Sequence, residues 1–264
     1  GNGIFDADDY LLAYVTGVCD WYYDTASRDY DYNFNHYESY RYYWLKKGGS
    51  NSTIKQFNCN AVPSITLSQF LNRVRYKQSN ELMWTYGGKP KGGLEWIWIR
   101  LNKYLMSFPY TLTFPDVDTN TTGYIKIVSG STSNNCSTSV SFGDSLLYDS
   151  CAWKPITNWC DSVLTIKLTI KLADRSDYFE LKHLDVKYWR HLDMSGKKSL
   201  RIYSPLDSGI IVAYQLSNLP SERTFIFRIP SDELNISLVN IISTGGSYSW
   251  TDTAGIGIQY FVCA

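Results

Sequence analysis

Residues 163–172 read Val-Leu-Thr-Ile-Lys-Leu-Thr-Ile-Lys-Leu, so every second position is apolar. In a β-strand successive side chains point to opposite faces, which predicts one buried and one solvated face here. The side chains expected to face inward are Leu164, Ile166, Leu168, Ile170 and Leu172. Six further apolar runs, separated at roughly the 8–12-residue spacing of an all-β sandwich or barrel, complete the chain. They cover residues 178–189, 198–203, 209–216, 224–229, 236–243 and 255–263.

The bulk properties limit the classes of function. A chain of 264 residues without a low-complexity linker can form one large β domain. Its 25 basic and 25 acidic side chains cancel, so no strong overall field attracts nucleic acid or a membrane surface. No apolar run approaches about 18 residues, and we expect no membrane insertion. The N-terminus lacks a signal-peptide pattern, which favours release from a precursor by a protease.

Cysteines and histidines give no metal or cofactor motif. The six cysteines stand at 19, 59, 136, 151, 160 and 263 without a Cys-x-x-Cys pair, and only His36, His183 and His191 accompany them. We favour free thiols, with three disulfides as the alternative, because a chain of this length can build a core without them. Glycosylation sequons begin at Asn51, Asn120, Asn135 and Asn235, and they keep a secreted protein as an alternative.

The first third of the chain is rich in aromatic residues. Ten tyrosines, two tryptophans and one phenylalanine lie between Tyr10 and Trp44. Residues 29–36 read Asp-Tyr-Asp-Tyr-Asn-Phe-Asn-His, and a strand would place Tyr30, Tyr32 and Phe34 on one face. That face could pack on a neighbouring strand, form a subunit interface, or stack on bases or sugars. Nucleic acid is the least favoured ligand because the surrounding segment is acidic.

One segment carries the pattern of a helix. Thr66-Leu67-Ser68-Gln69 has the form of a capping box. An apolar stripe at helical spacing follows, which predicts a helix over residues 66–75 with a buried or intersubunit face. The residues of this stripe are Leu67, Phe70, Leu71 and Val74.

Two segments resemble capsid proteins of picorna-like RNA viruses, the insect and algal types in particular. Residues 64–73, Ser-Ile-Thr-Leu-Ser-Gln-Phe-Leu-Asn-Arg, resemble the short helix that precedes their jelly roll, and residues 254–264 resemble their closing strand. The glycine at the N-terminus also resembles the product of a 3C-like protease. The aspartate pair before the final strand and the Trp-Arg-Gly-Ser segment after the helix are absent.

The resemblance implies an eight-stranded antiparallel jelly-roll sandwich with one or two short helices and long loops. Residues 1–62 would form an aromatic-rich arm with the first strands, and residues 63–264 the sandwich of a single structural domain. The protein would be a structural subunit of an icosahedral virion, assembled in the host cytoplasm with sister capsid proteins. Genomic RNA and a host receptor would be further partners. The expected interface residues are Tyr30, Tyr32, Phe34, Leu67, Phe70, Leu71 and Val74.

Two other functions compete with this expectation. Residues 140–146, Val-Ser-Phe-Gly-Asp-Ser-Leu, resemble the nucleophile block of GDSL-type esterases, with Ser145 as nucleophile and His183 as base. The block lies in the middle of the chain and no βαβ alternation surrounds it, so we expect no enzyme. The stronger alternative is a secreted or surface glycoprotein that binds carbohydrate or protein through aromatic loops.

Overall fold

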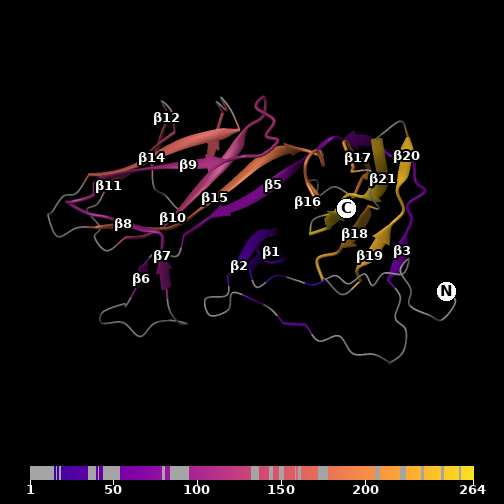
Figure 1. Cartoon of the computed structure of the whole chain (residues 1–264), viewed down its shortest axis with the longest axis horizontal. Helices are drawn as coiled ribbons and strands as arrows, with labels where there is room; N and C mark the ends of the chain where they lie inside the picture. The colour runs from indigo at the N-terminus through magenta and orange to yellow at the C-terminus, as the bar shows by residue number, and fades with distance from the viewer. Residues whose placement is uncertain are drawn as a thin grey trace. The chain divides into compact units, whose positions relative to one another are not determined.

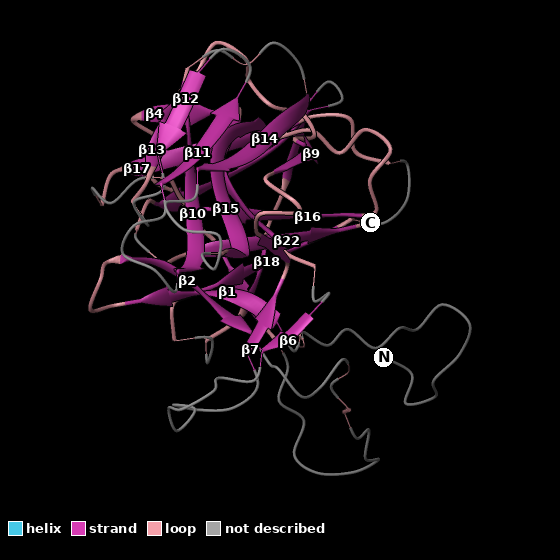
Figure 2. Cartoon of the chain, turned by 90° about the vertical axis from the view of Figure 1, so that its left-hand side faces the viewer, coloured by secondary structure: helices cyan, strands magenta, loops and turns pink. Residues whose placement is uncertain are grey.

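The fold was analysed in a computed structural model. It describes residues 15, 17, 19–34, 40, 42–43, 54–78, 81–83, 95–131, 137–142, 145–148, 152–157, 159, 162–171, 178–205, 209–220, 224–232, 235–244, 247–255 and 257–264. Within these ranges the regular structure consists of β-strands and contains no helix, as Figure 2 shows. The predicted all-β architecture is therefore confirmed. The chain divides into two compact units, Gly1–Asn51 and Ser52–Ala264.

The described part of the first unit is one antiparallel hairpin. Strand β1 (Cys19–Asp24) pairs with β2 (Asp29–Phe34) over their full length. Arg28, in the turn between them, has a φ of 53°.

The second unit contains two sandwiches, and the first of these consists of two sheets. In order across the first sheet, the strands are β13 (Lys154–Ile156), β10 (Gly123–Ser131), β15 (Phe179–His191) and β5 (Gln69–Tyr76), and β8 (Ile99–Leu101) also pairs with β15. The opposing sheet contains β12 (Ser145–Tyr148), β11 (Ser137–Phe142), β14 (Val163–Lys171) and β9 (Ser107–Thr113). Figure 1 shows these strands grouped on the left.

One hydrophobic core joins the two sheets of this first sandwich. Ile125 and Val186 come from the first sheet, and Leu112 and Ile166 from the second. Phe114 makes an edge contact with Trp159, with ring centroids 5.0 Å apart. In β14, Ile166 is buried while Val163, Thr165 and Lys167 are exposed, as the alternation predicts for these four residues. The side chains of Leu164, Leu168, Ile170 and Leu172 lie outside the described residues.

A second sandwich follows in the same unit. Across its first sheet the strands are β16 (Ser199–Tyr203), β22 (Gln259–Cys263), β18 (Phe225–Ile229), β19 (Ser237–Val239) and β3 (Lys55–Phe57). The other sheet contains β20 (Ile242–Thr244), β21 (Ser247–Thr253), β17 (Ile211–Leu216) and β4 (Ile65–Leu67). Strands β6 (Glu81–Met83) and β7 (Glu95–Ile97) form a separate hairpin. The eight-strand count expected of a jelly roll is thus not confirmed.

Aromatic rings and one buried carboxylate join the sheets of the second sandwich. Tyr214 stacks on Trp250, and Tyr260 of the opposite sheet lies 4.9 Å from the ring centroid of Tyr214. The buried Asp252 accepts hydrogen bonds from Arg228 Nε at 2.6 Å and from the Tyr260 hydroxyl at 2.5 Å. A buried carboxylate needs such partners, so this network fixes the two sheets against each other.

The expected helix over residues 66–75 is wrong. Residues 65–67 form β4, which pairs in parallel with β17, and residues 69–76 form β5, which pairs with β15. The same residues also alternate with a period of two, and that alternation buries Phe70 fully in the core. A capping box contributes about 1 kcal/mol, whereas burying Phe70 contributes about 1.5–3 kcal/mol in addition to the strand hydrogen bonds. Tertiary pairing therefore outweighs the local helix signal.

Candidate functional site

The hairpin of the first unit separates aromatic from acidic side chains. Trp21 faces Tyr32 across the two strands, and Tyr23 faces Tyr30, with ring centroids 5.1 Å and 5.5 Å apart. Both pairs meet edge to face, the geometry that aromatic quadrupoles favour. Tyr30 is buried and Tyr32 half-buried, as expected for an aromatic strand that packs on its neighbour. The side chain of Phe34 lies outside the described residues.

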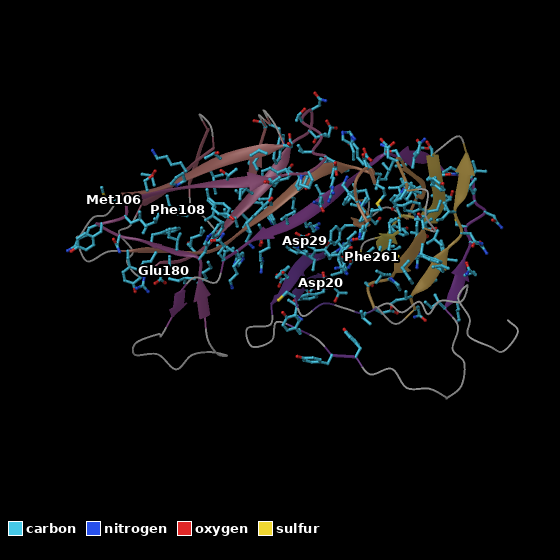
Figure 3. All side chains as sticks on the ribbon, viewed as in Figure 1. Asp20, Asp29, Met106, Phe108, Glu180 and Phe261 are labelled. Atoms are coloured by element: carbon cyan, nitrogen blue, oxygen red, sulfur yellow. The ribbon has the colours of Figure 1, made fainter. Side chains whose placement is uncertain are left out.

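The opposite face of the hairpin is acidic. It carries Asp20, Asp24, Asp29 and Asp31 together with Tyr22 and Asn33; Asp20 and Asp29 are labelled in Figure 3. The Tyr22 hydroxyl donates to Asp31 Oδ2 at 3.3 Å, and the negative charge of Asp31 raises the pKa of Tyr22. The backbone N–H of Ala26 donates to Asp24 and lowers the pKa of that carboxyl. The low pKa keeps Asp24 ionised at neutral pH, and the four aspartates make this face one that suits basic groups.

Three tyrosines beyond the hairpin are exposed. Tyr42 is 82% exposed, Tyr40 73%, and Tyr43 more than half. The sequence prediction of interface residues relied on the alternation of Tyr30, Tyr32 and Phe34, and it therefore did not include these three tyrosines. Their signal in the sequence is the density of aromatic residues between 37 and 44, where no strand alternation accounts for them. Large exposed tyrosines bury much area at low entropic cost when a protein partner covers them.

The apolar stripe expected on a helix does not form a single surface. Phe70 is fully buried, and Val74, on the same face of β5, packs against the core of the first sandwich. Leu71 lies on the other side of β5, because neighbouring residues of a strand face opposite ways. Leu67 ends β4 and is half-buried. Phe70 and Val74 thus support the fold of the chain itself.

The two esterase candidates lie on different sheets. Ser145 begins β12, whereas His183 lies in β15 and pairs with Val128 of β10. Burial, reinforced by the nearby charges of Arg75, Lys77, Lys126 and Lys182, lowers the pKa of His183 to about 3. His183 Nε2 lies 3.6 Å from Asp185, but Arg75 already binds that carboxylate at 2.6 Å and 2.7 Å. An imidazole with so low a pKa is a weak base for a serine nucleophile. The side chain of Ser145 lies outside the described residues.

Polar side chains also gather where the chain passes between the two sandwiches of the second unit. Asp116 accepts hydrogen bonds from Arg190 and Lys197, and Asp193 accepts from the Ser195 N–H and from Asn218. A cavity of about 290 Å³ nearby is lined by Ser68, His191, Asp193, Gln215, Ser217 and Ser247. Because both carboxylates serve as hydrogen-bond acceptors within the fold, this cluster is suited to structural support.

Metal and membrane features are absent from the part of the chain that the structure describes. No group of three or more His, Cys, Asp or Glu side chains there could hold a metal ion. Among the same residues, no helix is long and apolar enough to cross a membrane. Cys19, Cys59 and Cys263 carry free thiols, while the other three cysteines lie outside the described residues.

Comparison with known proteins gives a fold likeness and no family. No family model and no curated protein matches the chain. The chain resembles dimeric latent PorU from Porphyromonas gingivalis with a TM-score of 0.72 at 13% identity, over 94% of this chain and 25% of that one. The chain therefore spans about a quarter of PorU, and at this identity the likeness shows the fold alone.

Two other solved structures match less well. One is the CBM36-1 domain of a multidomain xylanase from the hindgut metagenome of Trinervitermes trinervoides, with a TM-score of 0.28, 18% identity and coverage of 44% and 96%. The other is the CUB1-EGF-CUB2 domain of human MASP-1/3, with a TM-score of 0.21, 8% identity and coverage of 63% and 98%. At these TM-scores neither likeness carries an argument about this chain.

Proposed function

We propose that the chain is a non-catalytic assembly module whose first unit binds a basic surface of a protein partner. The observation that carries this proposal is the exposure of Tyr40 and Tyr42 in the unit that also presents the acidic face of the β1–β2 hairpin. Exposed tyrosines supply contact area, and the aspartates supply charge complementarity, which speeds encounter and fixes orientation.

The use of charged groups in the second unit supports a role without catalysis. Three buried carboxylates, Glu180, Asp185 and Asp252, are each bound by an arginine. Buried carboxylates paired in this way stabilise a fold, whereas catalytic groups need a reacting atom within reach. The low pKa of His183 points the same way.

The capsid subunit implied by the sequence resemblance is one form of this proposal, with sister capsid proteins as the partners. Genomic RNA and a host receptor remain predictions within that form.

A surface glycoprotein is the second candidate, and the exposure of two sequons favours it. Asn120 lies on an exposed turn, and Asn235 is also exposed. Hexose-bearing peptides at either asparagine, in protein purified from its natural source, would select this alternative over the assembly module.

Sedimentation velocity of the whole chain at rising concentration tests the assembly proposal. We expect the wild type to self-associate, and added salt to weaken the association because charged groups contribute. The double variant Tyr40→Ser/Tyr42→Ser should weaken association at least about tenfold, since interface tyrosines act on binding. Its melting temperature should change by no more than about 2 °C, as for other exposed positions.

The matched control is Tyr124→Ser, which removes an exposed tyrosine from β10 of the second unit. It should leave association unchanged. A wild-type chain that stays a monodisperse monomer at high concentration, or a double variant that associates like the wild type, would overturn the proposal.

A further inference from the structure

The tight turn that connects β8 to β9 of the opposing sheet, which we call the tip, presents three consecutive large apolar side chains to solvent. Tyr104 is 85% exposed, Leu105 41% and Met106 53%. Figure 3 shows Met106 at the left-hand end of the ribbon, beyond Phe108 of β9. Single exposed apolar residues are ordinary, but three in succession at one turn form a contiguous patch that suits an apolar environment.

Hydrogen bonds hold this tip in one conformation. The backbones of Asn102 and Leu105 exchange two hydrogen bonds, each of 3.0 Å. The Asn102 side-chain oxygen also accepts from the N–H groups of Tyr104 at 2.8 Å and Leu105 at 3.2 Å. Because the turn is already ordered, binding through it costs little conformational entropy.

Along the chain, the segment that forms the tip carries charge of one sign. Residues 96–115 contain no Asp or Glu, and their two charged side chains are Arg100 and Lys103. Arg100 binds the buried Glu180, so its charge is largely offset. Lys103 Nζ lies 4.9 Å from the centre of the Tyr104 ring and is the cation of the tip itself.

We propose that this tip inserts into the headgroup region of an anionic lipid bilayer. Leu105 and Met106 enter the boundary of the acyl chains, Tyr104 lies at the interface where its ring is apolar and its hydroxyl wet, and Lys103 contacts acidic headgroups. A bilayer accepts such a tip without a complementary pocket. The tip enters only the interface, and its small area makes binding weak and reversible.

Vesicle flotation of the whole chain tests this site independently of the assembly proposal. Wild-type protein should float with vesicles of phosphatidylcholine and phosphatidylglycerol and should float less with phosphatidylcholine alone. The variant Tyr104→Ser/Leu105→Ser/Met106→Ser should reduce the bound fraction at least about fivefold. Lys103→Gln should reduce binding to the anionic vesicles about fivefold, the effect of one basic residue near such a surface.

Two control variants test whether lipid binding is specific to this tip. Ile242→Ser removes an exposed apolar side chain from β20 and should leave flotation unchanged. Tyr40→Ser/Tyr42→Ser should also float like the wild type, so loss of assembly and loss of lipid binding are distinguishable. Wild-type protein that does not float with anionic vesicles, or a triple variant that floats equally well, overturns the proposal. The proposal is also overturned if the tip only mediates self-association, that is, if the wild type forms oligomers without lipid and the triple variant does not.

Discussion

At the scale of single residues, His183 shows how burial governs protonation. Its imidazole lies in the central strand of a five-stranded sheet, near four cationic side chains. A positive charge placed there would lose hydration and gain repulsion, so the ring stays neutral in the folded chain. In the unfolded chain the same ring has an ordinary pKa of 6.5. The two states therefore bind different numbers of protons below neutral pH.

This difference predicts that the chain loses stability on acidification. The pKa is lower in the folded state, so only the unfolded state gains a proton as the pH falls through 6.5, and unfolding becomes easier down to a pH of about 3. Between about pH 7 and pH 5 the wild type should lose about 2 kcal/mol of unfolding free energy more than His183→Gln. Urea unfolding at the two pH values measures it, with the exposed His191→Gln as the control. Equal losses in the wild type and His183→Gln would contradict it.

At the scale of elements, β5 shows two sequence patterns in competition. Its residues carry a helical spacing at Phe70, Leu71 and Val74 and a strand spacing at Phe70, Asn72 and Val74. Pairing with β15 selects the strand, and Asn72 Nδ2 then donates to the buried Tyr188 hydroxyl at 2.8 Å. The polar Asn72, out of place on an apolar helix stripe, is satisfied on the inner face of the sheet.

The strand predicts unequal effects of two neighbouring substitutions. Phe70→Ala should lower the free energy of unfolding by about 3–5 kcal/mol, because it leaves a cavity where a fully buried ring of β5 was packed. Leu71→Ala, on the partly exposed side, should cost no more than about 1.5 kcal/mol. Denaturant unfolding of both variants measures the difference. Equal costs in the two variants would contradict the strand and would support a helix in which Phe70 and Leu71 share one buried face.

At the scale of the second unit, its two sandwiches are linked by more than one connection. The chain crosses between them at Ser68, from β4 to β5, and again between β15 and β16. At this junction the Leu192 N–H donates to Ser68 O at 2.8 Å, and the Ser217 N–H donates to Leu192 O at 3.0 Å. Disrupting one sandwich would break these bonds and expose the edge of the other.

We therefore predict that the second unit unfolds as one cooperative body. Phe70→Ala, in the first sandwich, should reduce the hydrogen-exchange protection of β22 amides in the second by the same free energy as those of β10. Native-state exchange of the wild type and the variant provides the comparison. Wild-type protection in β22 alongside reduced protection in β10 would mean that the sandwiches unfold separately.

The strand runs of the C-terminal half were predictable from the sequence because a period of two is a property of adjacent residues. Runs 178–189, 198–203, 209–216, 224–229 and 255–263 overlap β15, β16, β17, β18 and β22, although β22 begins only at Gln259. Strand β21 lies in none of the predicted runs. The run at 236–243 divides into β19 and β20, with Asn240 and Ile241 between them. The two faces of β2 were predictable for the same local reason, since Tyr30 and Tyr32 point to one face of the strand and Asp31 points to the other.

Only the tertiary structure decided which pattern β5 follows, how the sheets pair and which tyrosines remain exposed. Phe70 lies beside residues more than 100 positions away in the chain, such as Arg190, its paired residue on β15. The capping box that favours a helix acts within four residues, and it loses to burial and to a ladder of strand hydrogen bonds. Tyr30 and Tyr42 belong to the same aromatic segment, yet cross-strand packing covers the first and leaves the second in solvent. Periodicity is set by neighbours along the chain, whereas burial depends on contacts that exist only once the sheets have formed.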